Sequence, residues 1–69
     1  MKMSARNRIP GTITEIKKGA VMAKITIDIG GGNMITSAIL VDSVEDLALK
    51  NGDKVMAVIK STEVMVFRE

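Results

Sequence analysis

Apolar and polar residues alternate along several short stretches of the chain, most regularly in AVMAKITIDI at residues 20–29. Every second position of this stretch is apolar: Val21, Ala23, Ile25, Ile27 and Ile29. A period of two is typical of a β-strand with one buried face. RIPGTITEI, residues 8–16, alternates less regularly and predicts an earlier strand, with Pro10 restricting it to an edge or a strand start.

Two glycine-containing segments separate the predicted strands. KKGA at residues 17–20 and GGGN at residues 30–33 each predict a hairpin turn. A phosphate-binding loop is a poor match for GGGN, because no helix follows it and the lysine and hydroxyl residues of a P-loop are missing at the required spacing. A third strand, MITSAILV at residues 34–41, follows instead.

In DSVEDLALKNG, residues 42–52, apolar residues no longer occur at every second position but at a helical spacing, which predicts a short helix. Val44 and Leu47 can share one helical face, and Ser43 with Asp46 fits the capping pattern of a helix start.

Two further strands are predicted at residues 54–60 and 63–67. Five strands, with one short helical turn between the third and the fourth, predict an all-β fold: a small OB-like barrel formed by residues 1–69 as one domain. The third, fourth and fifth strands are apolar on both faces, and a barrel interior covers only one of them. The remaining apolar face favours burial against another chain, so we expect a homo-oligomer.

Composition supports self-association. A chain of 69 residues buries a small fraction of its surface, and the absence of Cys and His removes disulfides and the usual structural metal sites as sources of stability. No run of about 18 apolar residues predicts a membrane span, and no signal peptide is recognisable at the N-terminus. We therefore expect a cytoplasmic protein that does not bind membranes.

Catalysis is poorly supported by the side chains present. His, Cys and Tyr, which supply most general bases and the strongest nucleophile, are absent, and the carboxylates are scattered along the chain. Imidazole and thiolate ligands for transition metals are missing for the same reason. The sequence therefore predicts a protein that is not an enzyme and has no metal-cation site and no organic cofactor.

Hydrogen-bond donors and positive charge are concentrated in two segments at the ends of predicted strands. SARN places Ser4, Arg6 and Asn7 before the first strand, and KST places Lys60 and Ser61, followed by Thr62, after the fourth. Charged donors bind oxyanions through short, strong hydrogen bonds. From the residues alone, a solvated N-terminal leader and an ordinary turn explain these segments better than an anion site does.

Several segments in order give the whole chain a resemblance to the molbindins, the stand-alone form of the Mop domain. The matching segments are SARN at 4–7, GTI at 11–13, KKG at 17–19, GGN-x-ITS at 31–37, DSVEDL at 42–47 and KSTEVM at 60–65. The resemblance implies an OB-like barrel assembled as a hexamer, a trimer of dimers, that binds molybdate or tungstate at subunit interfaces. The role that it implies is storage and homeostasis of the oxyanion inside the cell.

The same resemblance assigns residues to the oxyanion site. Ser4, Arg6 and Asn7, with the backbone N–H of Ala5, form one wall. Lys60 and Ser61 form the other wall, contributed by a neighbouring subunit. By position, the backbone at Leu40 and Val41 is a further candidate for contact with the ion. The family also has a second kind of site on the symmetry axis, for which the turn at residues 18–21 is the candidate.

Two alternatives remain at this stage. An OB-type nucleic-acid-binding module is one, although such modules stack bases on exposed aromatic residues over a basic groove. The chain has a single aromatic residue, Phe67, and a net charge of +2. The other alternative is an oligomerisation module that binds no ligand.

Overall fold

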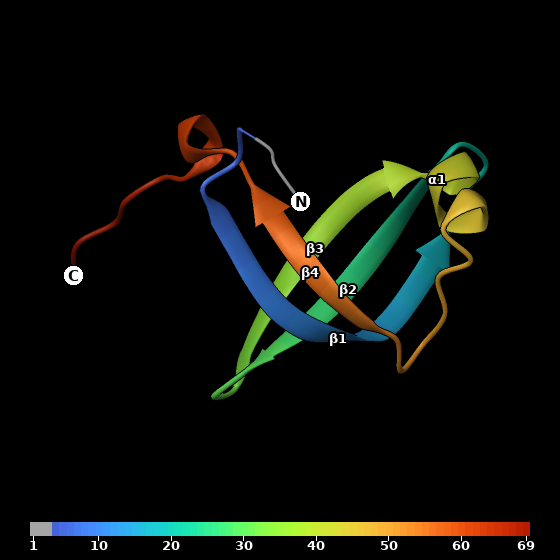
Figure 1. The fold of residues 1–69 in the computed structure, drawn as a ribbon, viewed down its shortest axis with the longest axis horizontal. Helices are drawn as coiled ribbons and strands as arrows, with labels where there is room; N and C mark the ends of the chain where they lie inside the picture. Colours follow the sequence, from blue (N-terminus) through green and yellow to red (C-terminus); the bar gives the residue numbers. More distant parts are fainter. Residues whose placement is uncertain (1–3) are drawn as a thin grey trace.

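The computed structural model describes residues 4–69, which form a curled antiparallel sheet with one short helix (Figure 1). The sheet order is β3-β2-β1-β4. The elements, in chain order, are β1 (Asn7–Lys18), β2 (Met22–Gly30), β3 (Asn33–Leu40), α1 (Val41–Asp46), β4 (Lys54–Ile59) and a 3₁₀ turn, η1 (Ser61–Glu63).

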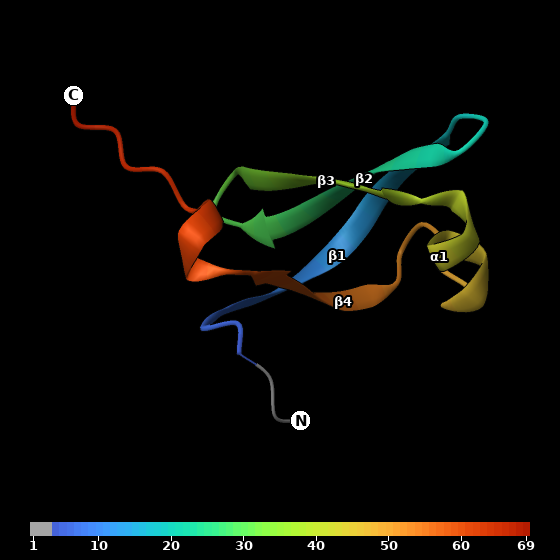
Figure 2. The ribbon, with the colours of Figure 1, turned by 90° about the horizontal axis from the view of Figure 1, so that it is seen from above.

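Four of the five predicted strands are confirmed, and the fifth is wrong for the isolated chain. Glu63 belongs to η1, and residues 64–69 form no strand. They leave the body of the molecule as an extended tail (Figures 1 and 2). A strand needs a partner edge to satisfy its backbone N–H and C=O groups, and this tail pairs with no edge of its own sheet. The isolated chain is therefore a half-barrel of OB-like form with β3 and β4 as free edges.

The curl of the sheet originates in β1. The first half of this strand pairs with β4 and the second half with β2, and Thr12 pairs with both. A bulge at Thr14, between the pairs formed by Ile13 and Glu15, bends the strand at this point. Gly11 lies at the bend, where a Cβ atom would be 2.5 Å from Ile27 Cγ2 and 2.8 Å from the Asp28 carbonyl. The bend therefore requires glycine.

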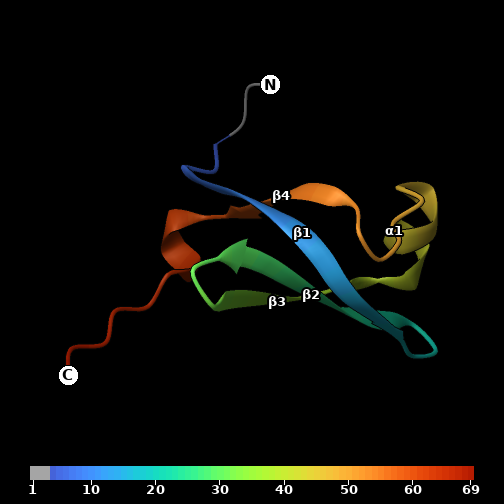
Figure 3. The same ribbon diagram turned by 90° about the horizontal axis from the view of Figure 1, so that it is seen from below.

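The core is formed by side chains of the curled sheet and of α1. Figure 3 shows how the strands curl and how α1 lies at one end of the sheet. The alternation in β2 is confirmed by its buried isoleucines, whereas Val21 lies in the preceding turn and is exposed. The buried residues that form the core cluster are Ile13, Ala23, Ile25, Ile27, Val44 and Ala57. These side chains come from β1, β2, β4 and α1. Packing among them therefore holds the helix against the curled sheet.

The short helix is confirmed, but its predicted cap is wrong. Leu40, in extended conformation, is the residue before the first turn, and no side chain caps it. Ser43 therefore lies within the helix. Val44 is 1% exposed and closes one end of the half-barrel, whereas Leu47 is exposed. Burial of Val44, rather than capping, fixes where this helix forms.

The GGGN hairpin is confirmed. Gly30 pairs with Asn33, and the two residues between them, Gly31 and Gly32, both have positive φ, which a two-residue hairpin turn of type I′ requires. Within residues 4–69, no helix is long and apolar enough to cross a membrane.

Candidate functional site: a cationic pocket between the start of β1 and the end of β4

The pairing of β1 with β4 brings the two donor segments together. Asn7 is the first residue of β1 and pairs with Ile59, the last residue of β4. The Asn7 side chain reinforces this pair, because Nδ2 donates to the Ile59 carbonyl at 3.2 Å. Residues 4–6 and 60–62 are therefore neighbours, although 52 positions separate Asn7 from Ile59 in the sequence.

A pocket of about 280 Å³ lies where the segments meet. It is a shallow hollow, and its lining residues are all exposed. They are Ser4, Arg6, Lys60, Ser61 and Thr62. The structure thus brings Ser4 and Arg6 together with Lys60 and Ser61 within one chain, and it adds the Thr62 hydroxyl. The resemblance implied instead that a neighbouring subunit contributes Lys60 and Ser61, but the pairing of β1 with β4 already places them beside Arg6.

The end of β4 turns sharply to present its donors. Lys60 is still extended, and the Glu63 amide then donates to the Lys60 carbonyl at 2.9 Å, which closes η1. Ser61 and Thr62 therefore project from a tight turn instead of continuing the strand. Both residues line the pocket together with Lys60.

The pocket has the chemistry of an anion site. Arg6 and Lys60 supply two positive charges, and the guanidinium and ammonium donate hydrogen bonds without accepting any. Three hydroxyls complete the lining, and no carboxylate belongs to it. This set of donors matches an anion with several acceptor oxygens. A pocket that is open on one side leaves part of such an ion in water.

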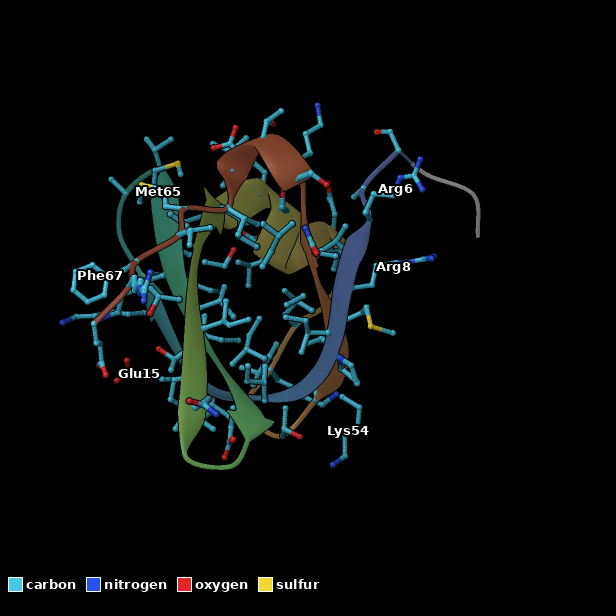
Figure 4. The ribbon with its side chains drawn as sticks, turned by 90° about the vertical axis from the view of Figure 1, so that its left-hand side faces the viewer. Arg6, Arg8, Glu15, Lys54, Met65 and Phe67 are labelled. Atoms are coloured by element: carbon cyan, nitrogen blue, oxygen red, sulfur yellow. The ribbon has the colours of Figure 1, made fainter. Side chains whose placement is uncertain are left out.

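Two residues expected at the site do not line this pocket. Ala5 is buried, so its methyl group packs against the body of the protein while its neighbours Ser4 and Arg6 face outward. Asn7 uses its side-chain amide on Ile59. Figure 4 shows Arg6 and Arg8 projecting from the same side of the molecule, but Arg8 does not line the pocket.

Leu40 and Val41 lie at the opposite end of the sheet. Leu40 pairs with Met22, next to the end of β1 at Lys18, whereas the pocket lies beyond the start of β1 (Figure 1). One chain therefore does not bring Leu40 or Val41 to the pocket. The Val41 amide donates to the Val21 carbonyl at 2.8 Å, so this pair adjoins the turn at residues 18–21 instead.

Comparison with known proteins identifies the family. Residues 3–66 match the family model described as the TOBE domain. Molybdenum-pterin-binding protein 1 of Clostridium pasteurianum is 50% identical over 66 residues, covering 96% of this chain and 97% of the relative. The probable molybdenum-pterin-binding protein of Haemophilus influenzae is 46% identical, with 96% of both chains covered. This chain belongs to the molbindin family.

Solved molbindin structures have the same fold. The molybdate-binding protein of Sporomusa ovata superimposes with a TM-score of 0.93 and 50% identity, covering 99% of this chain and all of that one. MopII of C. pasteurianum gives 0.90 at 48% identity, with 97% and 100% covered. The cytoplasmic molybdate-binding protein ModG, solved with molybdate bound, gives 0.84 at 43% identity, with 88% of this chain and 43% of ModG covered. None of these names describes an enzyme.

Proposed function

We propose that this molbindin binds molybdate or tungstate in the pocket between β1 and η1. The observation that carries the proposal is the convergence of Arg6 and Lys60, with the Ser4 and Ser61 hydroxyls, in one pocket. Two similar proteins support the choice of ion, because the S. ovata protein binds molybdate and ModG was solved with molybdate bound.

The charge of the pocket suits a dianion. Molybdate and tungstate each carry two negative charges near neutral pH, and Arg6 and Lys60 together offer two positive charges. Burying the ion is costly unless its charge is balanced and its oxygens accept hydrogen bonds. Ser4, Ser61 and the backbone N–H of Ala5 supply donors, while Asn7 positions this segment through its bond to Ile59.

A second copy of the chain completes the site. The pocket of one chain is shallow and its donors are exposed, so an ion held there would remain largely hydrated. Leu40, at the far end of the sheet, can contribute a backbone group only from a neighbouring copy, whereas the Val41 amide is already bonded to the Val21 carbonyl. The ion is therefore bound at a subunit interface.

The C-terminal tail supplies a physical reason for that association. Met65 is 94% exposed and Phe67 is 87% exposed, and the tail that carries both leaves the body of the molecule (Figures 1 and 2). Between the free edges of β3 and β4 lies a groove of about 310 Å³, lined in part by Ile35, Ala57 and Ile59. An apolar extended segment binds such an edge by adding a strand. The tail of a second copy fits here and closes the barrel with the fifth strand.

Exchange of tails produces a dimer, and further apolar surface remains to join dimers. At the end of the sheet near α1, three large apolar side chains are exposed: Met22, Leu40 and Leu47. We infer a homohexamer, built as a trimer of dimers, that stores and buffers the oxyanion in the cytoplasm. Binding only to the assembled form would couple assembly to ion concentration by mass action.

Isothermal titration with molybdate, tungstate, sulfate and phosphate tests the proposed function. We expect tight binding of the first two ions and weak binding of the others. Equal binding of all four would reduce the site to a general anion pocket, and absence of binding would leave an oligomerisation module. Binding of a single-stranded oligonucleotide instead would support the OB-type nucleic-acid alternative.

A further inference from the structure

The turn that leads into β4 contains Asn51 followed by Gly52, a dipeptide that the anion pocket does not use. Both residues are exposed. The Asp53 amide donates to the Lys50 carbonyl at 3.1 Å, and Gly52 has a φ of +92°. A hydrogen bond from the fourth residue to the first, with a positive φ at the third, is typical of a type II β-turn.

An asparagine followed by glycine is chemically labile, because glycine has no side chain to hinder attack by its own amide nitrogen. Hydroxide removes the Gly52 amide proton, and the nitrogen attacks Asn51 Cγ. An N–C bond forms, the bond from Cγ to the side-chain nitrogen breaks, and ammonia leaves. Water then opens the resulting succinimide to aspartate or isoaspartate. Solvent supplies the base and the water, and no electrons are transferred.

The fold restrains the nitrogen that must attack. The Gly52 amide donates to the carbonyl of Ile13 at 2.7 Å, and the Ile13 amide donates to the Asp53 carbonyl at 2.9 Å. Ile13 is 1% exposed and lies next to the β1 bulge. A side-chain bond adds to this restraint, because the Lys50 amide donates to Asp53 Oδ2 at 3.0 Å.

We propose that Asn51 is a latent deamidation site, closed in the native fold by the hydrogen bond from Gly52 to Ile13. Reaction requires the turn to open away from β1, so the rate at Asn51 follows the population of that open state. Isoaspartate would add a methylene to the backbone and a negative charge beside Asp53. The modified turn could not restore both hydrogen bonds to Ile13, and opening would become irreversible.

Peptide mass mapping of the full chain tests this proposal. Folded protein and protein in concentrated urea are incubated in the same mildly alkaline buffer, and the one-dalton mass increase at Asn51 is followed over time. We expect the folded protein to react more slowly by about tenfold or more, because only the open fraction reacts. Equal rates would show that the native fold does not slow the reaction. No reaction in urea would show that Asn51 is not a deamidation site.

A variant of the turn gives a second test. Asp53→Ala removes the carboxylate that holds the Lys50 amide, and it should accelerate deamidation of the folded protein several-fold. Glu63→Ala removes an equal charge from η1, outside the turn, and should leave the rate unchanged. Equal effects of both variants would contradict the proposal.

Hydrogen exchange of the backbone amides in the wild-type protein is a third test, which does not depend on whether Asp53→Ala folds. The Gly52 amide should exchange as slowly as the neighbouring Ile13 amide. Exchange of Gly52 at the rate of an unprotected amide would show that the nitrogen is not restrained.

Discussion

Asn7 and Ile59 form the last residue pair between β1 and β4, and the Asn7 side chain donates to the Ile59 carbonyl at 3.2 Å. This pair determines which residues can act together. Because the strands are antiparallel, the segment before Asn7 and the segment after Ile59 leave the sheet at the same place. The anion pocket therefore depends on strand register as much as on the side chains that line it.

Arg6→Ala should weaken molybdate binding most. Loss of one partner of a buried charge pair costs about 2 to 5 kcal/mol of binding free energy. Arg6→Lys keeps the charge but loses the planar fork of donors, so it should have an intermediate affinity. Arg8→Ala removes the same positive charge from outside the pocket and is the matched control. Isothermal titration that ranked Arg8→Ala as the more damaging variant would place the site elsewhere.

Lys60 should contribute more to molybdate binding than Ser61 does. Lys60→Met removes a charged donor, whereas Ser61→Ala removes one neutral hydrogen bond worth about 1 kcal/mol. Lys54→Met is the control for Lys60. Lys54 is an exposed lysine at the start of β4, the end of the strand away from the pocket, and its ammonium donates to Thr12 Oγ1 at 3.2 Å. Wild-type affinity of Lys60→Met would contradict the two-walled site.

The tail should control assembly. Deletion of residues 64–69 removes the proposed fifth strand, and light scattering should then report a mass well below that of the wild-type assembly, because the shortened chain has lost the contact that forms the dimer. Deletion of residues 68–69 alone keeps the apolar segment and should preserve the wild-type mass. A synthetic peptide of residues 63–69 should bind the truncated protein, because the groove between β3 and β4 is then vacant. An unchanged mass after the longer deletion would refute strand exchange.

Gly11 should be required for the bend in β1. Gly11→Ala places a Cβ atom against Ile27 and the Asp28 backbone, and overpacking of this kind costs about 1 to 3 kcal/mol of unfolding free energy. Gly32→Ala has open space around it and suffers only from its positive φ, at a cost of roughly 1 kcal/mol. Urea denaturation compares them, and equal midpoints would show that β1 adapts to the added methyl group.

The sequence predicted those parts of the fold that depend on local pattern. The alternation in β2 and the glycines at Gly31 and Gly32 led to the correct strands and hairpin. The fifth strand was wrong for one chain because residues 64–69 pair with no edge of its sheet. The helix cap was wrong because burial of Val44, which a local motif does not reveal, decides where α1 begins.

The candidate site was predictable in composition but not in geometry. The donors of Ser4, Arg6, Lys60 and Ser61 are visible in the sequence, and Thr62 stood beside them. Their proximity depends on the register of β1 against β4, which needs the folded sheet. The donors at residues 4–7 do not reveal, from the sequence, that the Asn7 side chain bonds to the Ile59 carbonyl and does not line the pocket.

Native mass spectrometry during a molybdate titration tests the central claim most directly, because it counts chains and bound ions in the same particle. The proposed function requires a homohexamer that takes up molybdate, while Arg6→Ala assembles but takes up less. The single chain should bind no ion, since its shallow pocket lacks the groups that a neighbouring copy contributes. A monomer that binds molybdate as tightly as the assembly, or a hexamer that binds none, would contradict the account.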